Sequence, residues 1–161
     1  ENQHFADERI PVLLQTPAAL RFISAEPLLG PIDLRGLAHR DDWHVDALDT
    51  PDPTRRLRWV IVGGESGPKA RPCHLQWIRS ILAQCHRAQV PCFVKQVGSD
   101  ALGPPQEPNR PWPSDGGRYG IPIGRGVGYY VLLTRDRKGG DSSEWPADLR
   151  VREWPNTVKG T

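Results

Sequence analysis

Methionine is absent from the chain, and cysteine is rare, with three residues among 161. Because translation begins with methionine, we expect the natural gene product to be longer than this sequence or to be processed. The opening residues, ENQHFADERI, read as the middle of a domain. We therefore interpret the chain as a fragment of a larger protein.

The three cysteines form no recognisable site in the sequence. They are separated by eleven and six residues, and neither spacing matches a zinc or iron–sulfur motif. An odd number of cysteines also provides no disulfide framework. We expect Cys73, Cys85 and Cys92 to be thiols that pack as small apolar side chains, and we predict no metal site.

Long apolar runs and a strong net charge are missing as well. No stretch approaches the roughly 20 apolar residues that a membrane-spanning helix needs, and no signal-peptide pattern opens the chain. A formal net charge of +2 requires neither a nucleic-acid nor a membrane partner. We therefore expect a cytoplasmic protein that does not enter a membrane.

Apolar periodicity predicts an α/β fold. The pattern indicates a helix over 7–16 with Pro11 near its start, strands over 20–26, 57–64 and 91–98, and a helix over 74–89. The run over 57–64 is nearly continuous, which is typical of a strand covered on both faces. Strand, helix and strand over 57–98 form a βαβ unit, so we expect a parallel sheet in a barrel or a doubly wound fold. Residues 35–57 are polar and are interpreted as a loop or insertion.

The composition changes at Gly98. Eleven of the 16 glycines and eight of the 17 prolines lie from this residue onward. We interpret residues 98–161 as an irregular Gly/Pro-rich extension with one strand over 128–134 and a turn at 138–140. We expect this extension to pack on the rest of the protein through Trp112, Trp145 and Trp154.

The stretch WVIVGGESGPKARP, residues 59–72, suggests a phosphate-binding loop at first sight. A Walker-type loop needs Gly-x4-Gly-Lys-Ser/Thr, whereas Gly63 and Gly67 are one residue too close. Pro68 lacks an amide donor, Ala70 replaces the hydroxyl residue, and Glu65 would repel a phosphate. A dinucleotide-binding G-x-G-x-x-G is absent too, so this stretch does not predict phosphate binding.

Polar residues follow each predicted strand at its carboxyl end. In parallel α/β folds these ends meet at one edge, where functional groups gather. Gly63 and Gly64 would let a ligand approach the strand backbone closely. The candidate site therefore comprises Glu1, Ser24, Glu26, Gly63, Gly64, Glu65 and Ser66, with Lys95, Gln96 and Arg71 as candidates for a substrate pocket. The alternative is that these groups only cap strands or pair with the loop arginines Arg71 and Arg58.

The histidines and a basic, aromatic segment are candidates for two other kinds of site, a metal site and a nucleic-acid-binding site. His39, His44, His74 and His86 share no ligand spacing, and DDWHVD over 41–46 is interpreted as a solvated loop rather than a cation site. Residues 110–138 hold six Arg or Lys against two Asp. Four aromatic residues are interleaved with these charges, a composition that suits stacking on single-stranded nucleic acid: Trp112, Tyr119, Tyr129 and Tyr130. A non-catalytic nucleic-acid-binding or phage-accessory protein is therefore the alternative function.

Four blocks of the chain resemble the carboxyl part of an uncharacterised phage and prophage protein family. They are RFISAEPLLGPIDL, WVIVGGESGPKARPCHLQWIRSILAQC, VPCFVKQVG and RKGGDSSEWPADLRVREWP. Full-length members of that family carry an amino-terminal three-cysteine motif like that of radical S-adenosylmethionine (SAM) enzymes. That motif is missing from this chain, and Cys73, Cys85 and Cys92 do not occupy its place.

The resemblance implies a partial (β/α) barrel of radical-SAM type over residues 1–97, followed by the extension over 98–161. It implies that SAM and a [4Fe–4S] cluster serve the full-length family. It also implies that SAM lies across the strand tips, meaning the carboxyl ends of the parallel strands. These ends surround the opening of the barrel, where the resemblance places Glu1, Ser24, Glu26 and Gly63 to Ser66. Without the cysteine motif, we expect no cluster binding and no radical chemistry from this chain alone. The family's substrate and reaction do not follow from the resemblance.

Overall fold

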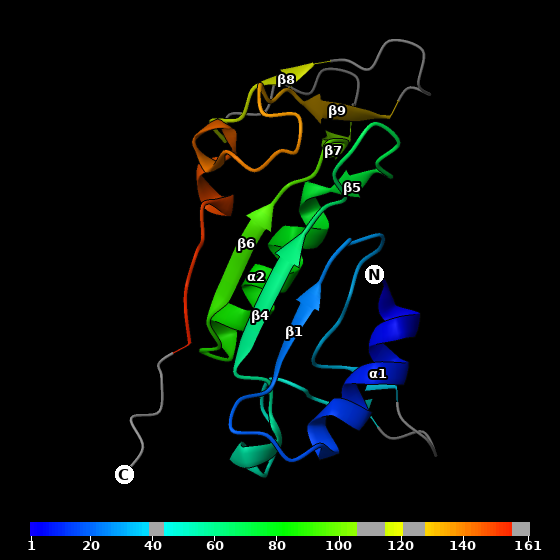
Figure 1. Ribbon diagram of the computed structural model, residues 1–161, viewed down its shortest axis with the longest axis vertical. Helices are drawn as coiled ribbons and strands as arrows, with labels where there is room; N and C mark the ends of the chain where they lie inside the picture. The colour runs from blue at the N-terminus through cyan, green and yellow to red at the C-terminus, as the bar shows by residue number, and fades with distance from the viewer. Residues whose placement is uncertain (39–43, 106–114, 121–127, 156–161) are drawn as a thin grey trace.

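The computed structural model describes residues 1–38, 44–105, 115–120 and 128–155, with the side chain of Pro105 left out. Its centre is a three-stranded parallel sheet in the order β1-β4-β6 (Figure 1). These strands are β1 (Phe22–Ala25), β4 (Trp59–Gly63) and β6 (Cys92–Gln96). The three predicted strands are thus confirmed, and the fold is mixed α/β. Over the described ranges the sheet is open and does not close into a barrel.

The helix α2 (Leu75–Arg87) connects β4 to β6 and covers one face of the sheet (Figure 1). Its apolar stripe includes Leu75, Ile78 and Ile81, which are fully buried. They pack in one core with Val60 and Val62 of β4. Burial of such side chains is the dominant stabilising term for a domain of this size.

The other face of the sheet is only partly covered, which corrects the prediction that β4 is covered on both sides. Val60 and Val62 are buried, but Trp59 and Ile61 alternate with them and are half-buried. Phe22, the residue paired with Trp59, is 46% exposed. Because successive side chains of a strand point to opposite faces, β4 has one buried face and one open face. A continuous apolar run alone did not distinguish this arrangement from full burial.

The first helix, α1 (Gln3–Gln15), begins four residues before the predicted start. The side chain of Asn2 accepts a hydrogen bond from the backbone of Phe5 at 3.4 Å and caps the helix. Pro11 lies inside the helix rather than near its start, and no acidic residue lies in the first turn. The prediction placed the helix start by the usual preference for proline in the first turn and did not consider Asn2 as a cap.

The segment over 35–57 is more ordered than a loop. It contains the short antiparallel strands β2 (Leu37–Ala38) and β3 (His44–Val45) and the 3₁₀ turn η2 (Pro53–Arg55). Leu37, Ala47, Leu48 and Leu57 are fully buried. These apolar residues anchor the segment although its overall composition is polar. The described part of the DDWHVD stretch, His44 to Asp46, belongs to β3 and its exit; residues 41–43 lie outside the described ranges.

The chain after Gly98 contains more sheet than the single strand that was predicted. A second sheet runs in the order β5-β7-β9-β8. Its members are β5 (Cys73–His74), β7 (Ala101–Pro105), β9 (Tyr129–Leu132) and β8 (Tyr119–Gly120). Two further 3₁₀ turns follow, η3 (Ser142–Glu144) and η4 (Ala147–Leu149). Strands β7 and β8 were not predicted from the sequence because they contain glycine or proline, and both residues are uncommon in strand interiors.

The end of the described chain returns to the central sheet. The amide of Val94 donates to the carbonyl of Val151, and the amide of Glu153 donates to the carbonyl of Cys92, both at 2.9 Å. Residues 151–153 therefore extend beside β6 in antiparallel fashion. Trp145 is fully buried, whereas Trp154 is 66% exposed; Trp112 lies outside the described residues. Among the described helices, none is long and apolar enough to cross a membrane.

Candidate functional site

Three of the predicted residues meet at the carboxyl ends of β1 and β6. The hydroxyl of Ser24 donates to Oε2 of Glu26 at 2.8 Å, and the ammonium of Lys95 lies 3.2 Å from the same oxygen. The other oxygen, Oε1, is buried and has no hydrogen-bond partner among the described residues. A buried carboxylate oxygen without a donor is costly. Glu26 therefore keeps one acceptor that a ligand could satisfy at this edge of the sheet.

Gly63 provides the space in which the Glu26 carboxylate lies. A Cβ placed on Gly63 would be 2.6 Å from Oε1 of Glu26 and 3.1 Å from the carbonyl oxygen of Gln96. The register between β4 and β6 also shifts at this point, where Gly63 pairs with Gln96 instead of Lys95. The close approach at Gly63 is thus made by the Glu26 side chain of the protein itself, whereas the sequence pattern predicted the approach of a ligand.

Gly64 and Gln96 hold the two strand ends together. The side-chain amide of Gln96 donates to the carbonyl of Gly64 at 2.8 Å, and the amide of Gly64 donates to the carbonyl of Gln96 at 3.1 Å. A Cβ on Gly64 would be 2.3 Å from the carbonyl oxygen of Val97. These contacts occupy both residues, so their role in the structure is to join β4 to β6 below the site.

Glu65 is engaged by Arg71, as in the alternative interpretation of the sequence. The guanidinium of Arg71 donates to both carboxylate oxygens at 2.8 Å, and the backbone amide of Arg71 donates to Oε2 at the same distance. These hydrogen bonds lower the pKa of Glu65 to about 2. The pair closes the loop over 65–71 and leaves Ser66 exposed at its tip.

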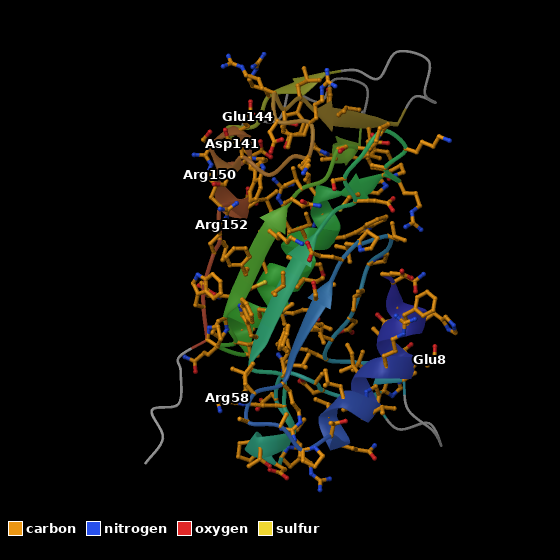
Figure 2. The ribbon with its side chains drawn as sticks, in the orientation of Figure 1. Glu8, Arg58, Asp141, Glu144, Arg150 and Arg152 are labelled. Carbon is orange, nitrogen blue, oxygen red and sulfur yellow. The ribbon has the colours of Figure 1, made fainter. Side chains whose placement is uncertain are left out.

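Arg58 takes no part in this arrangement. It precedes β4, and its amide donates to the carbonyl of Arg21 at 2.8 Å. Figure 2 shows Arg58 near the end of the molecule from which the strands start, far from their tips. The alternative pairing of strand-end carboxylates with Arg58 is therefore wrong, because parallel strands place these residues at opposite ends of β4.

Glu1 lies close to the strand tips. Its carbonyl accepts a hydrogen bond from the amide of Leu29 at 2.6 Å, while the amide of Leu28 donates to the carbonyl of Gly63 at 2.9 Å. The segment after β1 thus connects Glu1 to the end of β4. The negative charge of Glu1 also contributes to the raised pKa of Arg71, after the larger effect of the hydrogen bond to Glu65.

An acid titration tests the Glu65–Arg71 pair. We expect the Glu65 carboxyl, followed by NMR, to stay ionised until the pH falls toward about 2, since Arg71 depresses its pKa from 4.5. A depressed carboxyl pKa adds stability that is full above pH 4.5 and disappears as the pH falls through 2. In an Arg71→Gln variant the midpoint should return toward 4.5. An unchanged midpoint in that variant would contradict the pairing.

The cysteines lie in the core, and burial raises the pKa of the Cys73 thiol to about 12. Cys73 lies beside Gly64, whose added Cβ would be 3.0 Å from Cβ of Cys73. Cys92 pairs with Val60 at the opposite end of β4. Four residues of strand, about 13 Å, separate these two positions. The three thiols therefore do not converge on one ligand position. Among the described residues no group of three or more His, Cys, Asp or Glu is placed to hold a metal ion.

An aromatic cluster on the open face of the sheet was missed by the prediction. The ring of Trp154 lies 5.2 Å from the rings of Trp59 and Phe93, and Phe22 lies 5.5 Å from Trp59. Phe22 precedes Ser24 and Glu26 by two and four residues, and Phe93 precedes Lys95 by two. Residues two apart in a strand lie on the same face. This spacing was the sequence signal that could have placed Phe22 and Phe93 on the face of the predicted polar residues.

Part of the basic aromatic segment over 110–138 can be described. Tyr130 is buried, and the hydroxyl of Tyr119 donates to Asp115 at 2.8 Å in a half-buried position. Tyr129 is 39% exposed and packs edge-on against His74 at 4.4 Å. Two of the aromatic rings therefore support the second sheet. Nucleic-acid binding by this segment stays a prediction.

Comparison with known proteins decides the family. Residues 1–136 match the model of a family described as protein of unknown function (DUF5131). The chain belongs to the DUF5131 family. The matched range contains every strand-tip residue described above, and it ends before Trp145 and the segment that pairs with β6. No curated protein and no solved structure matches this DUF5131 chain.

Proposed function

We propose that the strand tips of this DUF5131 protein bind S-adenosylmethionine, in the carboxyl-terminal half of a radical-SAM-like enzyme of phage type. The observation that carries the proposal is the buried Oε1 of Glu26, which has no hydrogen-bond donor in the described part of the chain and lies beside Gly63. An ammonium or hydroxyl group of a ligand would supply the missing donor, and charge-assisted hydrogen bonds of this kind are the stronger ones.

The charges at the tips suit the amino-acid part of SAM. Glu26 would accept hydrogen bonds from the ammonium group, and Lys95, whose side chain is 57% exposed, would attract the carboxylate. Ser24 holds one oxygen of Glu26 and thereby orients the other. The Glu65–Arg71 pair lies at the neighbouring strand end and fixes the loop over 65–71 rather than offering a free acceptor.

The partly open face of the sheet also supports the proposal. The positions that precede Glu26 and Lys95 on this face are Phe22, Ser24 and Phe93, and α2 covers only the opposite face. In (β/α) barrels ligands lie at the carboxyl ends of the strands. An open, partial barrel would present this face to the cofactor and to the rest of the enzyme.

The cysteines of this chain do not fit a [4Fe–4S] cluster, because the three thiols are buried and do not converge. We therefore derive no step through a cluster from these residues. Bound SAM supplies the reactive group in enzymes of this class. The contribution proposed for this chain is limited to holding and orienting the cofactor through Glu26, Ser24 and Lys95.

A calorimetric titration of SAM tests the proposal, using the full-length gene product reconstituted anaerobically with iron and sulfide. We expect Glu26→Gln to weaken binding by about ten- to a hundredfold, because the amide lacks the charge that attracts an ammonium group. Gly63→Ala should weaken binding similarly, since its Cβ would displace Oε1 of Glu26.

Glu65→Gln is the matched control. It removes the same charge from the adjacent strand end, but from a carboxylate already paired with Arg71. We expect its effect on SAM affinity to be less than about threefold. Absence of binding to the reconstituted protein, or equal losses in Glu26→Gln and Glu65→Gln, would reject Glu26 as the SAM ligand.

A further inference from the structure

A cavity lies at the amino-terminal end of β6, away from the candidate site at the strand tips. It is a cleft of about 800 Å³ between the carboxyl-terminal half of α2 and residues 148–154. Cys92, the first residue of β6, lines it, whereas the candidate SAM site lies beyond Lys95 at the last residues of the strand. The two sites are therefore separate, and this cleft has no role in the function proposed above.

The walls of the cleft are mostly apolar and are held by the fold. Leu82, Val90, Pro91 and Val151 contribute apolar surface. The hydrogen bonds between residues 151–153 and β6 fix one wall, and the packing of α2 in the core fixes the other. A volume of this size is within the range of small-molecule sites, which are generally apolar with a few placed polar groups.

The charges of the cleft favour a cation. Its ionisable lining comprises two carboxylates, Asp148 and Glu153, against the guanidinium of Arg79 and the imidazole of His86. Arg79 is already shared between Asp148 at 2.6 Å and Asp115 at 2.7 Å, so its charge is compensated. The carboxyl end of α2 also faces the cleft and carries the negative end of the helix dipole.

Glu153 is the group suited to an ammonium ion. One oxygen of Glu153 accepts a hydrogen bond from the amide of Cys92 at 3.0 Å, which orients the carboxylate. Trp154, the next residue, packs its ring with Trp59 and Phe93 and lies at the edge of the cleft. A hydrogen bond from an ammonium group to the Glu153 carboxylate would be charge-assisted and therefore of the stronger kind.

We propose that this cleft binds an organic cation, namely an ammonium group carried on an apolar body. The apolar body lies against Leu82, Val90 and Val151, and the ammonium group lies at the carboxylate of Glu153. The arginines nearest in sequence do not neutralise this site. Arg150 donates to the carbonyl of Trp145, and Arg152 lies over the rings of Phe93 and Trp145. Figure 2 labels both arginines.

Three probes that share one carbon skeleton test the proposal: phenylpropylamine, phenylpropanol and phenylpropanoate. Each is titrated into the chain while the indole N–H resonances are followed by NMR. We expect the amine to shift the Trp154 resonance and to bind about five- to tenfold more tightly than the alcohol, while the carboxylate does not bind. Equal affinity for amine and alcohol, preference for the carboxylate, or no shift with any probe would overturn the proposal.

One variant and its control locate the binding site. Glu153→Gln keeps an acceptor for the Cys92 amide and removes only the charge, so amine affinity, read from ligand line broadening, should fall about threefold while alcohol affinity is unchanged. Glu8→Gln, on the exposed side of α1 (Figure 2), is the matched control and should have no effect. Unchanged amine affinity in Glu153→Gln would reject the site.

Discussion

Replacing Trp145 by alanine is expected to lower the free energy of unfolding by about 3–5 kcal/mol, the usual cost of removing a large buried aromatic side chain. Trp145 is fully buried, and its indole N–H donates to the carbonyl of Gly139 at 3.0 Å. Gly139 in turn accepts the amide hydrogen of Val97, directly after β6. The substitution would therefore leave a cavity and loosen the contact between the end of the chain and the central sheet.

Trp154→Ala is the matched control for this experiment, and urea denaturation followed by circular dichroism is the measurement. Trp154 comes from the same segment, but two thirds of its surface is exposed, and its ring is tilted against that of Trp59 and meets that of Phe93 edge-on. We expect it to cost about 1 kcal/mol. Similar losses in the two variants would mean that Trp145 does not anchor the extension.

The second large effect is expected for Gly64→Ala, which should destabilise the protein by about 3 kcal/mol or more. The added Cβ would lie 2.3 Å from the carbonyl oxygen of Val97, 2.8 Å from its carbonyl carbon and 3.0 Å from Cβ of Cys73. Two of these atoms belong to the backbone, so the clash cannot be relieved by a rotamer change. Strands β4 and β6 would have to separate at their ends.

Gly128→Ala provides the comparison, because no atom of the described residues lies within 4 Å of a Cβ at that position. Alanine there should be neutral or slightly stabilising, since it restricts the unfolded chain. Thermal unfolding of the two variants and the wild-type protein measures the difference. A melting temperature for Gly64→Ala within about one degree of the wild-type value would show that the strand ends are not packed as described.

Much of the central fold could be predicted because it is encoded locally. The strands over 20–26, 57–64 and 91–98 and the helix over 74–89 are apolar runs and stripes whose period follows from their own backbone geometry. The second sheet was missed because β7 and β8 contain glycine and proline, and their pairing depends on β5 and β9. Such strands are stabilised by partners distant in the chain rather than by propensity.

In the candidate site, too, the residue types follow from the sequence, whereas their pairing depends on the tertiary structure. From the sequence, Glu26 and Glu65 are equivalent, since each follows a strand and precedes a loop. In the structure Arg71 folds back onto Glu65, whereas one oxygen of Glu26 lies buried beside Gly63 and receives no hydrogen bond from any described residue. Whether a carboxylate is satisfied depends on where a loop and a neighbouring strand bring donors, and the residue types alone do not specify that.

The sequence by itself determined that polar residues end three parallel strands and that the cysteines match no metal motif, because strand period and ligand spacing are properties of short segments. Only the tertiary structure decided which carboxylate keeps one oxygen without a donor among the described residues, which glycine is needed for close packing, and that a cleft with two carboxylates lies between α2 and the end of the chain. The physical reason is that burial and pairing arise from contacts between distant segments, such as β6 with residues 151–153.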